Sequence, residues 1–162
     1  MRLSLKWLRE YVDFDLSPEE LAHSLTMTGL EVTSIQRIGE GWNNILVGHV
    51  TAIESHPDAD RLFLATVNLG DENLTVVCGA PNVSVGQKVP FARVGAHLFR
   101  EETGSLERLK AARIRGVRSE GMICSEQELG LSDDHTGILI LPEGAPIGAP
   151  LTEYLGDVIL NM

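Results

Sequence analysis

The stretch "RLFLATVNLGDENLTVVCGAP", residues 61–81, decides the fold class of this chain. Apolar side chains stand at every second position in its first part, at Phe63, Ala65, Val67 and Leu69. Such alternation is typical of a β-strand with one buried face. Gly, Asp and Asn then form a turn signal before a second short apolar run. The stretch therefore predicts two β segments separated by a turn.

Similar segments continue on both sides, from about residue 41 to about residue 141. They read "ILVGHVTAIES" (45–55), "QKVPFARVG" (87–95), "GMICS" (121–125) and "GILILP" (137–142). Five or six short strands punctuated by Gly, Pro, Asn and Asp predict a small closed barrel of the oligonucleotide/oligosaccharide-binding type, an OB-fold. A β-sandwich fits this pattern nearly as well.

Two helices are expected before the barrel. Ser4 is a candidate N-cap for the first helix, which places Leu5, Leu8 and Val12 on one face. The second helix carries a stronger signal, because Ser17-Pro18-Glu19-Glu20 has the spacing of a capping box. Gly29 is expected to end this helix.

Less regular segments flank the barrel. "LEVTSIQRI" (30–38) predicts a strand, and "GEGWNN" (39–44) predicts a turn and a boundary near residue 41. "APIGAPLTEYLGDVILNM" (145–162) predicts a short helix and a strand that stops at the chain end. That abrupt stop suggests a longer parent chain.

Length and composition limit the class of protein. A chain of 162 residues with 43% hydrophobic residues can form one to two small domains. No run approaches the roughly 20 apolar residues of a membrane span, and no secretory signal is evident. We expect a cytoplasmic protein without membrane contact, in which Cys78 and Cys124 are reduced.

The formal net charge of −10 argues against tight, sequence-independent binding of nucleic acid. The charge is unevenly distributed, however. Residues 93–118 hold seven of the 13 Lys and Arg residues, whereas residues 119–162 hold eight carboxylates and no Lys or Arg. One short segment is therefore a candidate site for an anionic partner.

Two acidic clusters with histidine raise the hypothesis of a metal-dependent hydrolase. "HPDADRL" (56–62) and "SDDHTG" (132–137) together supply His56, Asp58, Asp60, Asp133, Asp134 and His135. Pro57 and the Asp-Ala-Asp sequence are typical of a turn, which would scatter these side chains. Turn and capping roles are therefore the main interpretation, and a metal site is the remote alternative.

Catalytic and phosphate-binding motifs are weak. Cys78 and Cys124 lie in apolar, β-rich runs, where a buried structural cysteine is the commoner explanation than a nucleophile. "CGAPNVSVG" (78–86) and "VGAH" (94–97) contain loop glycines but no phosphate-binding pattern. The residues thus predict no catalytic site.

The basic segment "RLKAARIRGVRSEGM" (108–122) allows three interpretations. If Arg113 and Arg115 lie on one extended strand, their side chains share a face and can bind a phosphate backbone. The segment can equally be a solvated edge strand. Its cations can also pair with the acidic residues of 119–162.

A set of motifs in this order resembles the tRNA-binding OB domain found in several synthetases and in stand-alone tRNA-binding proteins. They are "HPDADRLFLATVNLG", "VVCGAPNV", "VPFARVGAHL", "ARIRGVRSEGMICSEQELGL" and "SDDHTGILILP". The preceding "SLKWLREYVDFDLSPEELAHSLTMTGLEV" is similar to the N-terminus of the bacterial phenylalanyl-tRNA synthetase beta subunit. The resemblance covers nearly the whole chain.

The resemblance implies an α+β chain with a five-stranded OB-fold barrel inserted into a small, incomplete α/β domain. Residues 1–40 would be the first part of the N-terminal domain, 41–150 the OB domain and 151–162 the truncated return strand. In this reading His56 ends a strand, residues 58–60 turn the chain and Leu62 re-enters the core.

The resemblance also implies the functional context. The chain would be a non-catalytic fragment, with no cofactor of its own, of an aminoacyl-tRNA ligase that joins phenylalanine to tRNA using ATP and Mg²⁺. Its partners would be tRNA and the catalytic alpha subunit, in a heterotetramer of two alpha and two beta subunits. A purely structural role in domain or subunit packing is the alternative.

The expected tRNA-contacting residues lie in the basic segment, and they are Lys110, Arg113, Arg115, Arg118 and Ser119. The loop "FREETGSLER" (99–108) is longer and more acidic than the short glycine-rich turn that the resemblance implies at this position. Its carboxylates Glu101, Glu102 and Glu107 are expected to shield the basic segment.

Overall fold

A computed structural model describes residues 1–162, which divide into two compact units. One unit contains residues 1–40 together with 155–162, and the other contains residues 41–154. The domain limits expected from the sequence, 1–40, 41–150 and 151–162, stay a prediction. No helix is long and apolar enough to span a membrane.

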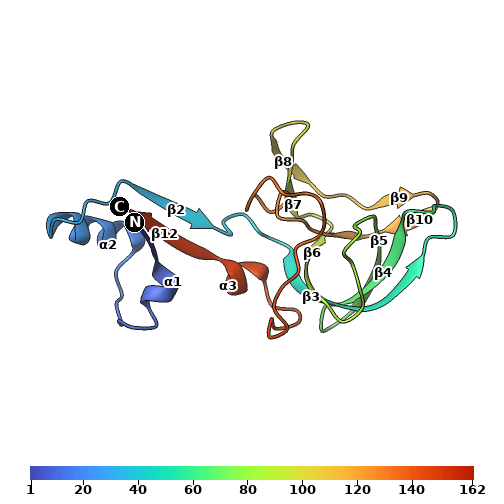
Figure 1. Ribbon diagram of the computed structural model, residues 1–162, viewed down its shortest axis with the longest axis horizontal. Helices are drawn as coiled ribbons and strands as arrows, with labels where there is room; N and C mark the ends of the chain where they lie inside the picture. Colours follow the sequence, from blue (N-terminus) through green and yellow to red (C-terminus); the bar gives the residue numbers. More distant parts are fainter. The chain divides into compact units, whose positions relative to one another are not determined.

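The first unit is built on a three-stranded antiparallel sheet in the order β1-β12-β2. Its strands are β1 (Arg2–Ser4), β2 (Ser34–Ile38) and β12 (Asp157–Asn161). The last strand of the chain is thus the middle strand, and the two termini lie side by side (Figure 1). The Met1 ammonium donates to the Met162 carbonyl at 3.0 Å.

The helices of this unit begin where the sequence predicts. Helix α1 (Leu5–Leu8) follows Ser4, whose Oγ accepts the Trp7 N–H. Residue 12 was expected to extend its apolar face, but α1 is a single turn and Val12 is 52% exposed. Only Leu5 of this helix is buried, and a helix gains most of its stability by burying an apolar face.

Helix α2 (Pro18–Met27) has the predicted capping box at its start. The Glu20 N–H donates to the Ser17 Oγ at 3.1 Å, and the Glu20 carboxylate accepts the Ser17 N–H at 2.8 Å. At its end Gly29 has a φ of 104°, and the Leu30 N–H bonds to the Leu25 carbonyl. Together with the bond from the Gly29 N–H to the Thr26 carbonyl, this bond forms a Schellman cap. Leu30 therefore belongs to the helix end, and β2 begins at Ser34 rather than at residue 30.

The second unit is a five-stranded antiparallel sheet in the order β11-β6-β3-β4-β5. Its strands are β3 (Ile45–Ser55), β4 (Phe63–Asn68), β5 (Asn73–Cys78), β6 (Lys88–Arg93) and β11 (Gly121–Ile123). A bulge between Val50 and Ala52 bends β3, and the outermost strands β5 and β11 contact each other. The sheet therefore closes into a nearly complete OB-like barrel, and the sandwich alternative was wrong.

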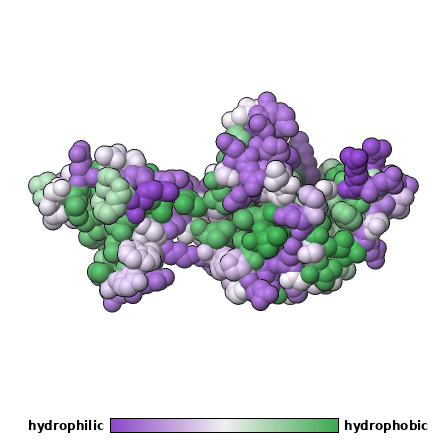
Figure 2. Space-filling view, viewed as in Figure 1, coloured by the Kyte–Doolittle hydropathy of each residue, from purple (hydrophilic) through white to green (hydrophobic).

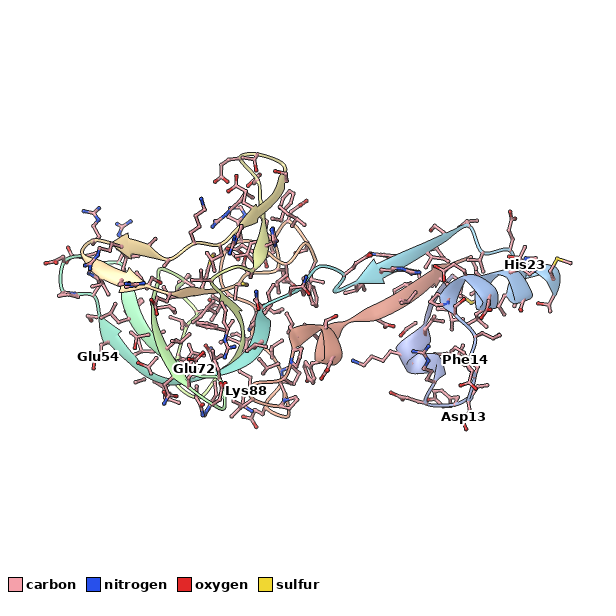
Figure 3. The ribbon with its side chains drawn as sticks, turned by 180° about the vertical axis from the view of Figure 1, so that it is seen from behind. Asp13, Phe14, His23, Glu54, Glu72 and Lys88 are labelled. Carbon is pink, nitrogen blue, oxygen red and sulfur yellow. The ribbon has the colours of Figure 1, made fainter.

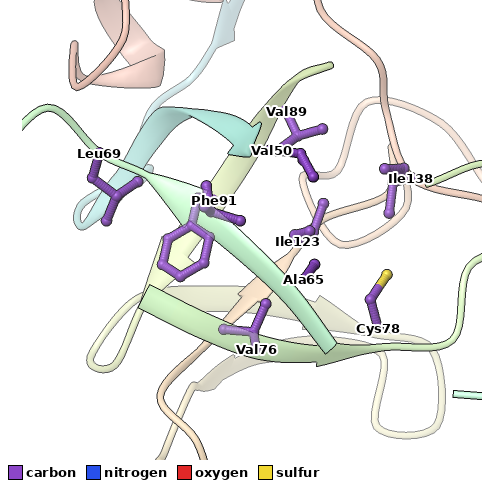
Figure 4. Close-up of a cluster of buried hydrophobic side chains, with 10 residues drawn as sticks. Val50, Ala65, Leu69, Val76, Cys78, Val89, Phe91, Ile123 and Ile138 are labelled. Carbon is purple, nitrogen blue, oxygen red and sulfur yellow. The ribbon is translucent and has the colours of Figure 1, made fainter. Parts of the chain in front are cut away.

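The barrel core follows the alternation seen in the sequence. Ala65 and Val67 of β4 are fully buried, and Phe91 of β6 is buried among them (Figure 4). Cys78 and Ile138 lie at one end of this cluster, and Leu69 lies at the other (Figure 4).

The expected strand "GILILP" was wrong, because only an isolated bridge from Leu141 to Lys88 forms there. The side chain of Asn82 takes the place of a strand partner: its Oδ1 accepts the Ile138 N–H, and its Nδ2 donates to the Ile138 carbonyl. The chain then continues to the predicted short helix α3 (Leu151–Leu155) and to β12.

Two hairpins that the sequence did not predict project from the barrel (Figure 1). They are β7 (His97–Arg100) with β8 (Ser105–Arg108), and β9 (Ala112–Ile114) with β10 (Val117–Ser119). The second hairpin carries most of the basic segment.

Candidate nucleic-acid interface

The β9–β10 hairpin is closed by the two-residue turn Arg115-Gly116. Both residues have positive φ, 52° for Arg115 and 86° for Gly116. Two successive positive φ values are the geometry of a type I′ turn, whose twist matches that of paired strands. The turn fixes the register, in which Ile114 pairs with Val117 and Arg113 pairs with Arg118.

This register corrects the expectation that Arg113 and Arg115 share one extended strand. Arg115 lies in the turn, whereas Arg113 and Arg118 lie opposite each other on neighbouring strands. Side chains of directly paired residues project from the same face of a hairpin. The structure therefore brings Arg113 together with Arg118 rather than with Arg115. The sequence does carry a signal for this turn: Arg115-Gly116 stands between two short runs of β-forming residues.

The cations of the interface are exposed to solvent. Lys110, Arg113, Arg115 and Arg118 are all in the exposed class, and nitrogen-tipped side chains surround this end of the unit (Figure 3). Arg118 pairs with Glu120 at 2.7 Å, but no ion pair forms at Lys110, Arg113 or Arg115. Of the expected pairing with the acidic residues of 119–162, only the contact with Glu120 is present.

Ser119 has a different environment from the other four expected residues. It is 4% exposed, and its Oγ accepts the Val77 N–H and donates to the Gly121 carbonyl, both at 3.2 Å. Its hydroxyl thus joins the end of β10 to the barrel strand β5. Ser119 is placed to hold the hairpin against the barrel.

His56 holds the other strand of the hairpin, β9. Its Nε2 lies 3.0 Å from the Ile114 carbonyl, and its Nδ1 accepts the Asp58 N–H at 3.0 Å. Because Nδ1 accepts, the proton of the neutral ring lies on Nε2 and is donated to Ile114. His56 is 5% exposed, so this ring is a buried link between the β3–β4 turn and β9.

The acidic residues near the hairpin form a turn rather than a metal site. No group of three or more His, Cys, Asp and Glu side chains in residues 1–162 is arranged to hold a metal ion. In the second cluster the Asp134 Oδ1 accepts the Thr136 N–H at 3.0 Å and the Thr136 hydroxyl at 2.7 Å. These bonds hold the pKa of the Asp134 carboxyl below its usual value. Both clusters therefore have the hydrogen bonds of turns.

Neither cysteine has the environment of a nucleophile. Both are buried, and burial raises the pKa of the Cys124 thiol and of the Cys78 thiol. Glu128 adds to both shifts, since a nearby negative charge disfavours a thiolate. A reactive cysteine requires the opposite, a lowered pKa and partial exposure.

The acidic loop expected to shield the basic segment is the tip of the β7–β8 hairpin. Glu107 pairs with Arg100 at 3.9 Å, and the Glu101 carboxylate accepts from the Gln127 Nε2 at 3.1 Å. None of its carboxylates forms an ion pair with Lys110, Arg113, Arg115 or Arg118. Figure 2 shows mostly hydrophilic surface over this hairpin, above a more hydrophobic patch of the barrel. Shielding by direct contact is therefore absent in this structure.

A nearly closed OB-like barrel with an exposed arginine hairpin is an architecture that nucleic-acid-binding domains use. The family model described as "Putative tRNA binding domain" matches residues 45–150, which is more than half of the chain. The chain belongs to this family of putative tRNA binding domains.

Within this family, the chain is similar to one kind of curated protein. The chain is 51% identical over 162 residues to the phenylalanine--tRNA ligase beta subunit of Dehalococcoides mccartyi, covering 100% of this chain and 20% of that protein. It is 51% identical over 161 residues to the beta subunit of Salinibacter ruber, covering 96% of this chain and 19% of that protein. The chain thus spans about a fifth of the length of the curated relatives that it matches.

Solved structures show lower similarity. A MetRS related protein from Pyrococcus horikoshii has 24% identity and a TM-score of 0.45, over 65% of this chain and 85% of that chain. The C-terminal domain of Plasmodium vivax p43 has 25% identity and a TM-score of 0.46, over 67% and 58% of the two chains.

Proposed function

We propose that this chain is the accessory, non-catalytic tRNA-binding module of a phenylalanine--tRNA ligase beta subunit, and that the β9–β10 hairpin contacts the tRNA backbone. The observation that carries the proposal is the exposed cross-strand pair of Arg113 and Arg118. The family match and the identity to ligase beta subunits support tRNA as the ligand.

The chemistry of the pair suits a phosphate. Like charges directly opposite each other destabilise a hairpin, and an anion bound between them offsets this repulsion. A guanidinium donates two parallel hydrogen bonds to phosphate oxygens. Lys110 and Arg115 add charge on either side of the pair, and Ser119 serves as a positioning residue beneath it.

The same contacts predict weak sequence discrimination. Contacts to phosphates position a nucleic acid, whereas base contacts specify its sequence. Residues 108–122 contain no aromatic side chain on which a base could stack. The hairpin therefore serves general docking of tRNA.

The reaction, cofactors and partner subunit of the whole ligase are part of the same proposal. The relatives are named phenylalanine--tRNA ligase beta subunits. Following the resemblance, we propose that the parent ligase attaches phenylalanine to tRNA with ATP and Mg²⁺ in the cytoplasm, and that it contains a catalytic alpha subunit in a heterotetramer of two alpha and two beta subunits. We assign none of that chemistry to residues 1–162. We also propose that the OB unit is an insertion in the first domain, because residues 157–161 pair with residues 2–4 and 34–38.

A structural role without RNA contact is the second candidate. It is favoured by apolar side chains left exposed in the first unit, among them Trp7 at 53%, Tyr11 at 70% and Met27 at 75%. Nearby, Phe14 lies under the Arg9 guanidinium in the connection between α1 and α2 (Figure 3). Such side chains are available for packing against another protein surface.

Salt dependence of tRNA binding distinguishes the two functions. We would measure affinity at about 50 and 200 mM salt for the unmodified chain and for Arg113→Ala/Arg118→Ala. The double variant is expected to bind at least about tenfold more weakly and to lose about two units of salt slope, because each lost phosphate contact removes about one.

The matched control is Arg100→Ala/Arg108→Ala, which removes the same charge from the β7–β8 hairpin. This control is expected to keep the salt slope. If the unmodified chain does not bind tRNA at the lower salt concentration, or if both double variants behave alike, the β9–β10 hairpin is not the tRNA contact.

A further inference from the structure

A cavity of about 270 Å³ lies between the ends of β5 and β11. Its walls come from residues 77–81, from Met122, Ile123, Ser125 and Glu128, and from residues 135–138. The apolar part of the wall includes Cys78, Ile123 and Ile138, the end of the barrel core seen in Figure 4. Its volume is slightly below the usual range for ligand pockets of about 300–1,000 Å³, so it suits a single small group.

The polar part of the wall contains an unsatisfied hydroxyl. Ser125 is only 5% exposed, and its Oγ has no hydrogen-bond partner in the protein. Its backbone N–H donates to the Glu128 Oε2 at 2.8 Å, so the serine and the carboxylate are held side by side. A buried hydroxyl without a partner is unfavourable, and a ligand that bonds to it removes this penalty.

The charge of the wall limits the ligand. Glu128 is the only carboxylate of the wall, His135 is its only basic side chain, and no Lys or Arg lines the cavity. A phosphate would be repelled by this carboxylate and would find no arginine or lysine. The fitting ligand is a flat group with adjacent N–H donors for the carboxylate and an acceptor for the Ser125 hydroxyl.

Guanine has this pattern on one edge. Its N1–H and 2-amino groups can donate together to the Glu128 carboxylate. The Ser125 Oγ is closed off from solvent in the structure, so the serine donates to O6 after a rotation about χ1. Adenine presents the ring nitrogen N1 as an acceptor at the equivalent place, which a carboxylate repels. The apolar ring faces of guanine suit the walls at Cys78 and Ile138.

The cavity is physically connected to the proposed RNA interface. Val77 lines the cavity, and its N–H donates to the Ser119 Oγ at the end of the arginine hairpin. We propose that this cavity binds one unstacked guanine base of the RNA whose phosphates the hairpin contacts. This inference rests on the proposed function, and it adds a base-specific contact that the hairpin lacks.

Nuclear magnetic resonance of the full chain tests the inference with nucleosides, which carry no phosphate for the hairpin. On addition of guanosine, the amide signals of Gly79, Ser125 and Gly137 are expected to shift. Inosine lacks the 2-amino group and is expected to bind roughly tenfold more weakly, because a bidentate base contact is lost. Adenosine is expected to shift none of these signals.

Two variants identify the polar groups. Glu128→Gln replaces one oxygen by an amide that faces the guanine donors, and it is expected to abolish the preference for guanosine over inosine. Ser125→Ala keeps the backbone bond to Glu128 and is expected to weaken guanosine binding at least fivefold. Glu126→Gln is the matched control: Glu126 does not line the cavity, and its carboxylate accepts from Ser132.

The outcomes separate this inference from the proposed function. Salt-dependent tRNA binding without guanosine-induced shifts would overturn the guanine site and leave the hairpin contact intact. Equal shifts with guanosine and adenosine would also overturn it. A preference for guanosine over inosine that Glu128→Gln abolishes, in a chain whose tRNA binding does not depend on Arg113 and Arg118, would support the cavity while refuting the hairpin proposal.

Discussion

At the scale of single residues, His56 shows how a buried polar side chain can be mistaken for a catalytic one. Its sequence setting next to two aspartates suggested metal chemistry. In the structure both of its ring nitrogens are occupied by backbone groups, at Ile114 and at Asp58. A ring with both nitrogens engaged has no lone pair left for a metal ion.

His56→Ala is expected to destabilise the protein by about 1–3 kcal/mol, because it leaves a carbonyl and an N–H without their partner. Chemical denaturation measures the free energy of unfolding. The control is His23→Ala, since His23 is exposed on α2 (Figure 3). Equal stability of the two variants would show that His56 does not link the turn to the hairpin.

Ser119 and Ser125 show a limit of prediction at this scale. Ser119 was expected among the RNA-contacting residues, and Ser125 was not singled out by the sequence. Both are buried, yet one hydroxyl is satisfied by two backbone groups and the other by none. Sequence cannot distinguish them, because the partners of Ser119 lie on a strand more than 40 residues away and on the next strand.

At the scale of elements, local signals predicted most of the strands and helices. Period-two alternation predicted β4, and the capping box predicted the start of α2. The two hairpins were missed because their strands are three or four residues long, too short for a clear period. "GILILP" was wrong because an apolar run is compatible with a strand whether or not a partner strand is present.

At the same scale, the pairing of β6 with β11 requires a glycine at position 121. A Cβ at this position would lie 2.4 Å from the Phe91 Cζ and 2.8 Å from the Ala92 carbonyl oxygen. Gly121→Ala is therefore expected to destabilise the barrel by about 1–3 kcal/mol through overpacking.

The same denaturation measurement checks this prediction against Gly144→Ala, because a Cβ at Gly144 would meet no atom within 4 Å. The control variant is expected to have nearly unchanged stability. A tolerated Gly121→Ala would mean that β6 and β11 can move apart without loss.

At the scale of the whole molecule, charge opposes the proposed function. The chain carries a net charge of −10, while the hairpin presents a local cluster of cations. Charges separated by more than about 10 Å are largely screened at about 0.1 M salt. The hairpin can therefore bind an anion although the protein as a whole is acidic.

Glu101→Gln/Glu102→Gln tests the shielding expected from the acidic loop. Because these carboxylates make no ion pair with the hairpin arginines, any effect must act at long range. We expect tRNA affinity to rise about two- to fivefold at roughly 10 mM salt and to be unchanged at roughly 200 mM.

Glu10→Gln/Glu40→Gln, which makes the same charge change in the first unit, is the control for net charge. If Glu101→Gln/Glu102→Gln still binds tRNA more tightly than the unmodified chain at the higher salt concentration, the acidic loop shields the hairpin directly.

The amino-acid sequence alone was enough to predict the β-rich class, the caps of the helices, the family and the segment that holds most of the cations. These features depend on neighbouring residues, through side-chain period, capping hydrogen bonds and ordered motifs. The folded chain was needed to show that Arg113 faces Arg118, that His56 and Ser119 are buried anchors, and that Ser125 lines a cavity. The reason is physical: strand register and burial depend on hydrogen bonds and packing between segments that are distant in the chain.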